Sequence, residues 1–141
     1  MAPSKAPKMA MSDAQPTQDV GTMIRSNGKF RRDYIYVHEA VEAYLLLTEK
    51  MVSHKLLGQA FNFNGETLST LEITRKILQL MDRSDLKPVI LNKAPDEILE
   101  QSLSANKAHR LLGWKTHYTI QKGLEETIAW YKKYLSQKVH A

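Results

Sequence analysis

An alternation of side chains identifies one strand early in the chain. Within residues 30–37, Tyr34 and Tyr36 share one face and aliphatic residues take the other, which is the two-residue period of a β-strand. The preceding residues 26–29 contain Asn-Gly, the strongest short hairpin signal. The pattern therefore predicts that residues 23–25 pair with this strand as a hairpin.

Helical spacing begins at His38. Apolar positions recur every three or four residues as far as Val52, as on one side of an amphipathic helix. Glu39 and Glu42 suit the positive N-terminal end of such a helix. The residues expected on its apolar stripe are Val41, Tyr44, Leu45, Thr48 and Val52.

Two short strands and a capped helix are predicted next. Residues 60–64, which Asn64-Gly65 closes, and the apolar run of residues 88–91 are predicted as short strands. Ser69 and Glu72 form a capping-box pattern, in which the hydroxyl and the carboxylate each satisfy a free backbone N–H. The residues that this helix is expected to turn inward are Ile73, Ile77, Leu80 and Met81.

The last part of the chain predicts two more helices. Residues 104–112 form a short helix that Gly113 ends, and Thr119 caps a final helix. The apolar stripe of the final helix comprises Ile120, Leu124, Ile128, Tyr131 and Leu135. Short strands that alternate with about four helices indicate an α/β fold.

Composition is typical of one soluble domain. The 141 residues are 43% hydrophobic, lack cysteine and carry a net charge of +5. Residues 1–21 are basic, contain prolines and lack periodicity, so we expect a disordered tail, with a domain over 22–137 and a second tail over 138–141. No apolar run reaches the length of about eighteen residues that spans a membrane, and no secretory signal is visible, which favours the cytoplasm. No aromatic residues alternate with the charges of the basic tail, so a nucleic-acid partner is not expected.

Four segments resemble the extended short-chain dehydrogenase/reductase family, the NAD-dependent epimerases and 4,6-dehydratases of nucleotide sugars. They are RDYIYVHEAVEA (32–43), GQAFNF (58–63), SANKAHRLLGW (104–114) and GLEETIAWY (123–131), in the family's order and spacing. In the family, the first segment lies well past the cofactor-binding half. The resemblance therefore implies the C-terminal, substrate-binding part of such an enzyme without its Rossmann half, most similar to the 4,6-dehydratases.

The resemblance also implies binding residues. Arg32 matches the arginine that contacts the substrate diphosphate in the family, and its planar fork can hold two phosphate oxygens. Lys93 and Arg31 are further candidates for substrate binding, although strand alternation turns Arg31 to the opposite face. For Arg32, a salt bridge with Asp33 or with a helix carboxylate is the structural alternative. No metal site is expected.

Cofactor binding and catalysis are expected to be missing from this chain. Complete relatives imply NAD or NADP, whose pyrophosphate needs closely spaced glycines, and the six glycines here are at least seven residues apart. The family's catalytic Tyr-x-x-x-Lys has two literal matches, Tyr118 with Lys122 and Tyr134 with Lys138. Both lie in segments that resemble the family's C-terminal helix and its lead-in, so neither pair is expected to be catalytic.

Two functions follow as hypotheses. The first is a truncated epimerase or 4,6-dehydratase-like protein, related to lyases, that keeps the nucleotide-sugar binding region and is inactive by itself. The second is a non-catalytic interaction module that docks on itself or on a Rossmann-bearing partner chain. A domain that lacks the larger, cofactor-binding half would expose the helix faces that this half covers in a complete enzyme.

Overall fold

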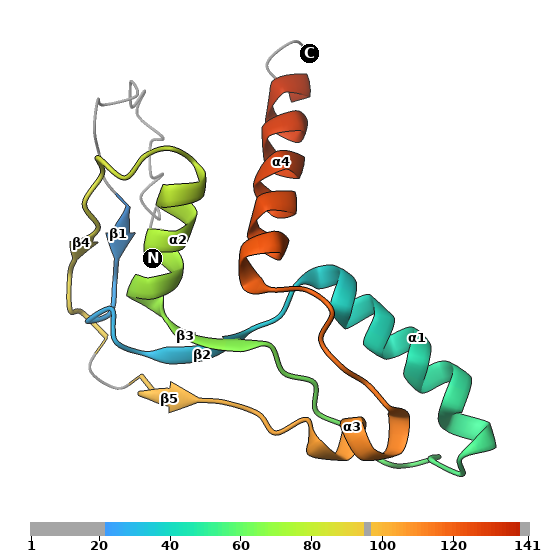
Figure 1. Cartoon of the computed structure of the whole chain (residues 1–141). Coiled ribbons are helices and arrows are strands. Elements are labelled where there is room, and N and C mark those ends of the chain that lie inside the picture. Colours follow the sequence, from blue (N-terminus) through green and yellow to red (C-terminus); the bar gives the residue numbers. More distant parts are fainter. Residues whose placement is uncertain (1–21, 95–96, 139–141) are drawn as a thin grey trace, which may run out of the picture.

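A computed structural model describes residues 22–94 and 97–138 of the chain. Within these residues four helices alternate with five short strands (Figure 1), so the predicted α/β class is confirmed. The expected tails lie outside the described residues, except Lys138, which is the last residue of the final helix. In chain order the elements are β1 (Met23–Ile24), β2 (Arg31–Tyr34), α1 (Val37–Ser53), β3 (Glu66–Ser69), α2 (Thr70–Leu80), β4 (Val89–Ile90), β5 (Glu100–Gln101), α3 (Asn106–Leu112) and α4 (Ile120–Lys138).

The strands form two small sheets. In the larger one β2 lies in the centre, antiparallel to β3 and parallel to β5. In the smaller one β1 pairs in parallel with β4. The predicted hairpin between residues 23–25 and 30–37 is therefore wrong. The turn redirects the chain instead, because Gly28 has a left-handed φ of +78° and the Lys29 N–H donates to Asn27 Oδ1 at 2.9 Å.

The other strand predictions are partly right. Residues 88–91 contain β4, as expected, but residues 60–64 are irregular and the strand begins at Glu66. Gly65 immediately precedes β3, and a Cβ there would lie 1.9 Å from the Tyr34 carbonyl oxygen. The chain needs this close backbone approach before β3 can run beside β2. No pattern predicted β5, which has only two residues.

The helix α1 is confirmed, but its predicted apolar stripe faces away from the core. Glu39 and Ala43 are the buried residues of α1. They lie on the opposite side, where α1 contacts α3. The exposed apolar residues of the predicted stripe, called here the outer face of α1, are Val41 (53%), Tyr44 (73%), Leu45 (58%) and Val52 (73%). The buried core cluster beneath α1 comprises Ala43, Leu56, Ala105, Ala108, Leu112 and Trp114.

The predicted capping box of α2 is present. The Glu72 N–H donates to Ser69 Oγ at 3.2 Å, and the Ser69 N–H donates to Glu72 Oε2 at 2.7 Å. The helix buries Ile73, as expected, together with Leu78. Met81 was predicted to face inward, but it caps the C-terminal end of the helix and is exposed.

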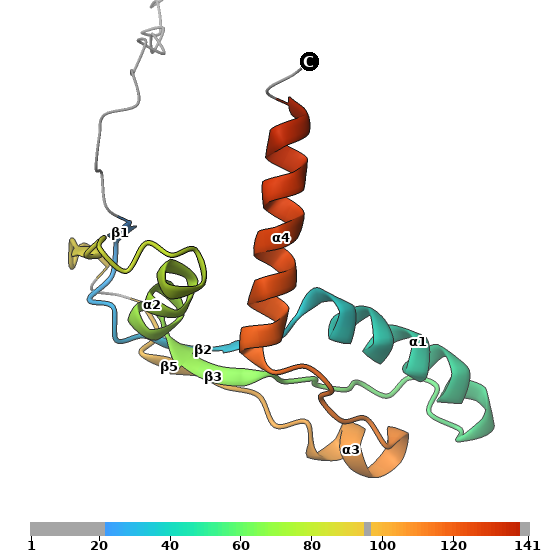
Figure 2. The same cartoon turned by 45° about the horizontal axis from the view of Figure 1, so that its top comes forward.

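The last two helices end and begin as predicted. Gly113 stops α3 in the left-handed conformation, with φ of +68°, and Thr119 Oγ1 accepts the Lys122 N–H at 3.2 Å at the start of α4. The second half of α4 projects away from the sheets (Figure 2), so Tyr131 and Leu135 of the predicted stripe are exposed. Within residues 22–94 and 97–138 no helix combines the length and the apolar character needed to cross a bilayer.

Candidate functional site

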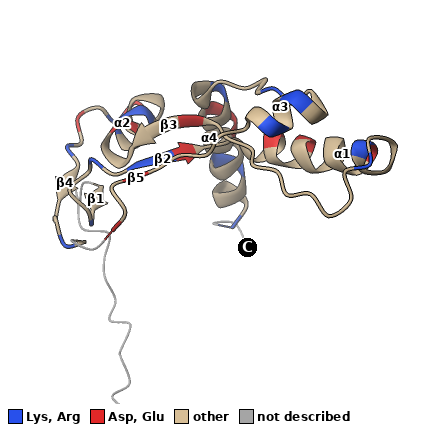
Figure 3. Cartoon of the chain, turned by 90° about the horizontal axis from the view of Figure 1, so that it is seen from below, with Lys and Arg blue, Asp and Glu red and all other residues tan. Residues whose placement is uncertain are grey.

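The central strand β2 presents the arginine that the sequence singles out. Arg32 Nη1 donates to the Arg31 carbonyl oxygen at 2.7 Å, and Nη2 donates to Glu97 Oε1 at 3.3 Å. The side chain of Arg32 is 26% exposed. Along β2 a basic segment is followed by an acidic one (Figure 3), because Asp33 follows Arg31 and Arg32, and Glu100 of β5 lies in register with Arg31. Arg32 therefore forms an ion pair with Glu97, a carboxylate in the loop between β4 and β5.

Arg31 has different partners. Its Nη2 donates to the Thr67 carbonyl oxygen at 2.9 Å, and its Nη1 lies 3.5 Å from Oε2 of Glu72, a carboxylate in the first turn of α2. Hydrogen bonds from Ser69 hold the pKa of Glu72 below its usual value, and the charge of Arg31 acts in the same direction. Arg31 therefore joins β2 to β3 and to the start of α2.

Asp33 pairs with neither arginine. It accepts hydrogen bonds from Thr67 Oγ1 at 2.5 Å and from the Leu103 N–H at 2.6 Å. These bonds connect β2 to β3 and to the segment that follows β5. Asp33 is therefore a structural acceptor, and the alternative salt bridge of Arg32 with Asp33 is not formed, since Arg32 pairs with Glu97.

Lys93 lies near the partner of Arg32. Its N–H donates to the Arg25 carbonyl oxygen at 2.8 Å. Lys93, Arg25 and Glu97 line one open cleft of about 740 Å³ beside β1. The structure thus brings Lys93 and the Arg32–Glu97 pair to the same region, and their role in substrate binding stays a prediction.

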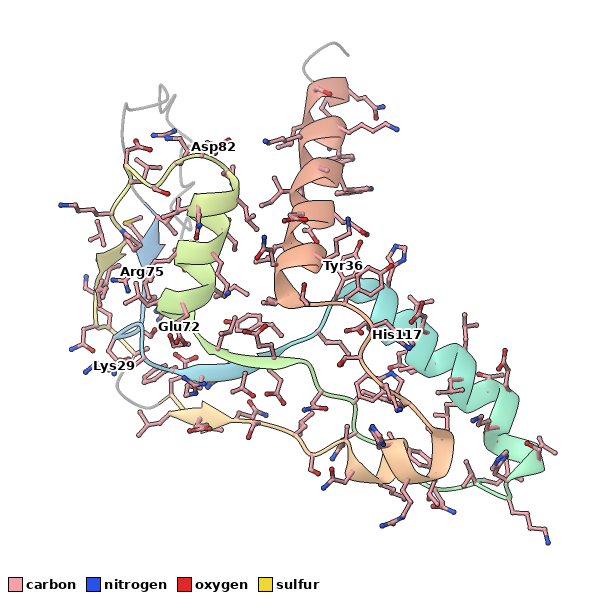
Figure 4. The ribbon with its side chains drawn as sticks, viewed as in Figure 1. Lys29, Tyr36, Glu72, Arg75, Asp82 and His117 are labelled. Carbon is pink, nitrogen blue, oxygen red and sulfur yellow. The ribbon has the colours of Figure 1, made fainter. Side chains whose placement is uncertain are left out.

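A polar and aromatic junction between β2, α1 and α4 was missed by the sequence reasoning. The Tyr36 hydroxyl donates to Glu126 Oε2 at 2.8 Å, and its ring stacks on His38 at 5.1 Å and meets Tyr118 at 5.0 Å. Figure 4 labels Tyr36 at this junction. The hydrogen bond to Glu126 raises the pKa of Tyr36, and burial acts in the same direction. The phenol therefore stays protonated at neutral pH.

A cleft of about 560 Å³ opens above this junction, between α2 and α4. Its lining is mostly apolar, with Ile73 from α2 and Leu124 and Trp130 from α4. Clefts of this size and character commonly hold ligands. The alternation of tyrosines in β2 could have pointed to one wall, but Glu126 is ninety positions from Tyr36 and no local pattern connects them.

A buried carboxylate fixes the entrance to α4. Glu39 is 3% exposed, and its Oε1 accepts the backbone N–H groups of His117 and, at 2.9 Å, of Tyr118. The first turn of α1 is thereby tied to the segment that leads into α4. Glu39 was expected only to favour the helix dipole, so its tertiary role is a finding of the structure.

The two Tyr-x-x-x-Lys matches differ in their contacts. Tyr118 precedes α4 and packs on Tyr36, while Lys122 Nζ pairs with Glu126 at 3.6 Å. Lys138 Nζ lies 4.9 Å over the face of the Tyr134 ring. Across the described part of the chain, no three His, Asp or Glu side chains are grouped to hold a metal ion.

Known proteins share both the sequence and the fold. The chain is 30% identical to a dTDP-glucose 4,6-dehydratase of Haemophilus influenzae over 77% of this chain and 34% of that enzyme. It is 27% identical to a UDP-glucose 4-epimerase of Cyamopsis tetragonoloba over 77% of this chain and 31% of that enzyme. The chain thus spans about a third of the length of the curated relatives that it matches.

Solved structures agree at the level of the fold. A UDP-glucose 4-epimerase of Thermotoga maritima, determined with UDP-glucose, has a TM-score of 0.67 at 23% identity, covering 82% of this chain and 36% of its own. A dTDP-glucose 4,6-dehydratase of Bacillus anthracis, in complex with NAD, has a TM-score of 0.63 at 22% identity, covering 79% and 34%. No family model matches the chain.

Proposed function

We propose that the chain, which matches about a third of the length of its relatives, belongs to the extended short-chain dehydrogenase/reductase family and binds the diphosphate of a nucleotide sugar through Arg32. Because the chain is similar to dTDP-glucose 4,6-dehydratases, we propose nucleotide sugars such as dTDP-glucose as its ligands. Lys93 is proposed as a supplementary cation and Arg31 as a structural neighbour, because Arg31 is already engaged by Thr67 and Glu72.

The observation that carries this proposal is the placement of Arg32. A backbone carbonyl of β2 orients the guanidinium, and a single exposed carboxylate occupies its other edge. A guanidinium so oriented can hold two oxygens of one phosphate group. Charge-assisted hydrogen bonds contribute about 1.5–3 kcal/mol, so loss of the guanidinium should weaken binding of a nucleoside diphosphate about ten- to a hundredfold.

The test is a calorimetric titration of the chain with dTDP and with UDP. We expect Arg32→Ala to weaken binding about ten- to a hundredfold, and Arg32→Lys to recover only part of it, because an ammonium cannot form the fork. Arg110→Ala, at an exposed position of α3, is the matched control. Equal affinity of the Arg32→Ala and control variants would contradict the proposal.

We propose further that this chain holds no NAD by itself. Its six glycines include no closely spaced pair, and the turn from β2 to α1 consists of Ile35 and Tyr36. The Tyr36 ring also occupies that turn, against His38 and Tyr118. These residues do not fit a pyrophosphate cradle, so hydride chemistry is not assigned to this chain.

A second candidate function is a docking module for a Rossmann-bearing partner. The outer face of α1 favours it, because four large apolar side chains there are more than half exposed. Contiguous apolar surface of this kind is typical of interaction sites. The outer face lies opposite the side of α1 that packs on the core, so docking would leave the fold undisturbed.

This second function is tested by light scattering on the chain mixed with a separately expressed Rossmann-bearing segment of a dTDP-glucose 4,6-dehydratase. We expect a one-to-one complex that Leu45→Glu abolishes. Leu57→Glu, at a loop position that is 68% exposed, should leave it intact. Absence of a complex, or equal loss with both variants, would count against docking through α1. A homodimer of the chain alone, abolished by Leu45→Glu, would assign the face to self-association.

A further inference from the structure

The guanidinium of Arg32 is divided between two acceptors of different kinds. One edge donates to the Arg31 carbonyl oxygen at 2.7 Å, a neutral acceptor that belongs to β2 itself. The other edge donates to the carboxylate of Glu97 at 3.3 Å, sixty-five positions along the chain. The first contact is fixed by the strand, whereas the second depends on a loop side chain.

The contact with Glu97 has the geometry of an exchangeable ion pair. Its distance of 3.3 Å is longer than the 2.7–2.9 Å of a strong charge-assisted bond. It involves one donor and one oxygen, and the Glu97 side chain is 47% exposed. Exposed pairs of this kind contribute little to stability, so a diphosphate that engages the fork with two oxygens can replace the carboxylate.

The surroundings of Glu97 fit the same interpretation. Glu97 lines the cleft of about 740 Å³ together with Arg25 and Lys93, which are the cations that an anion entering this region would meet. Its carboxylate supplies a negative charge where the ligand's phosphate is proposed to lie. The described residues thus place an internal anion within reach of Arg32 and beside two further cations.

We propose that Glu97 is an internal competitor for the anion site of Arg32 and sets the affinity of that site. The inference rests on the proposed function, since it concerns the same guanidinium. An anion that binds through the fork must displace Glu97, and a site that is only partly available lowers the apparent affinity in proportion. Removing the charge of Glu97 should therefore tighten binding of every anion that uses Arg32.

The experiment titrates dTDP and inorganic pyrophosphate into wild type, Glu97→Gln, Arg32→Ala and the double variant. Glu97→Gln should bind both anions about two- to fivefold more tightly, the factor expected from losing an exposed ion pair. The double variant should bind as weakly as Arg32→Ala. Glu100→Gln is the matched control, because Glu100 is exposed on the neighbouring β5 and lies in register with Arg31.

The outcomes separate this inference from the proposed function. If Arg32→Ala binds the anions more weakly but Glu97→Gln binds them as the wild type does, Glu97 is not a competitor. Arg32 would still be the residue that binds the diphosphate. If Glu97→Gln and Glu100→Gln tighten anion binding equally, the effect comes from the overall charge of the protein and not from displacement of Glu97. That result would also overturn the inference. If Arg32→Ala binds dTDP like the wild type, the proposed function itself is wrong.

Discussion

At the scale of single residues, the junction after β2 depends on the absence of side chains as much as on their presence. A Cβ on Gly123 would lie 2.9 Å from Tyr36 Cβ, so α4 can approach Tyr36 only because position 123 is glycine. Gly65 allows a similar approach to the Tyr34 carbonyl oxygen. These contacts bring Tyr36 within hydrogen-bonding distance of Glu126.

Tyr36 gives a prediction about alkaline stability. Its hydrogen bond to Glu126, with burial and nearby negative charge, raises its pKa above the ordinary 10.0. A raised folded-state pKa means that this stabilisation is complete below pH 10 and is lost as the pH rises through the folded value. Tyr36→Phe should therefore flatten the decline of unfolding free energy as the pH rises above about 10.

The measurement is urea unfolding across that pH range. Tyr44→Phe is a matched control, because Tyr44 is 73% exposed on the outer face of α1 and should leave the alkaline decline unchanged. If Tyr36→Phe declines with pH as steeply as wild type, the bond to Glu126 does not determine the titration of this phenol.

At the scale of elements, α2 is specified by its own sequence more completely than α1. The hydroxyl of Ser69 and the carboxylate of Glu72 satisfy two N–H groups that have no partner within the helix. In α1 the N-terminal position is held by Tyr36, whose side chain makes no capping bond. The beginning of α1 depends instead on Glu39 and its tertiary bonds to residues 117 and 118.

We predict that Ser69→Ala lowers the free energy of unfolding by about 1 kcal/mol, the usual effect of removing an N-cap. Ser102→Ala, at an exposed position after β5, should change it little. Chemical denaturation followed by circular dichroism compares the two variants. Equal stability of both would indicate that the capping box is dispensable for α2.

At the scale of the whole molecule, two helices leave apolar side chains exposed. The outer face of α1 and the projecting half of α4, with Trp130, Tyr131 and Leu135, have no cover among the described residues. The sheets are small, and β1, β4 and β5 have only two residues each. The fold therefore places the candidate Arg32 on a short strand, and the relatives that share the fold are more than twice as long.

The whole chain is predicted to be inactive by itself. Incubated with NAD and dTDP-glucose, the purified chain should form no 4-keto-6-deoxy product, because hydride transfer belongs to a cofactor that this sequence is proposed not to hold. Product formation is followed by its absorbance in alkali, with a complete dTDP-glucose 4,6-dehydratase as the positive control. Turnover by the chain, or NAD binding at micromolar affinity, would contradict the prediction.

The sequence by itself determined the features that depend on neighbouring residues. The capping box at Ser69, the stop at Gly113 and the cap at Thr119 were all predicted correctly, since each requires hydrogen bonds or a backbone conformation within a few positions. The four helices and the resemblance to the family also follow from local patterns. The candidate Arg32 came from that resemblance, and its binding role stays a prediction.

Only the tertiary structure decided which surfaces meet. The period of α1 predicts an apolar stripe, but the buried side is that of Ala43, because small side chains allow α3 to approach closely. The turn at Gly28 has a hairpin sequence, yet β1 takes β4 as its partner. The pairs Arg32–Glu97 and Tyr36–Glu126 join residues far apart in the chain, and contacts of that kind depend on the arrangement of whole elements.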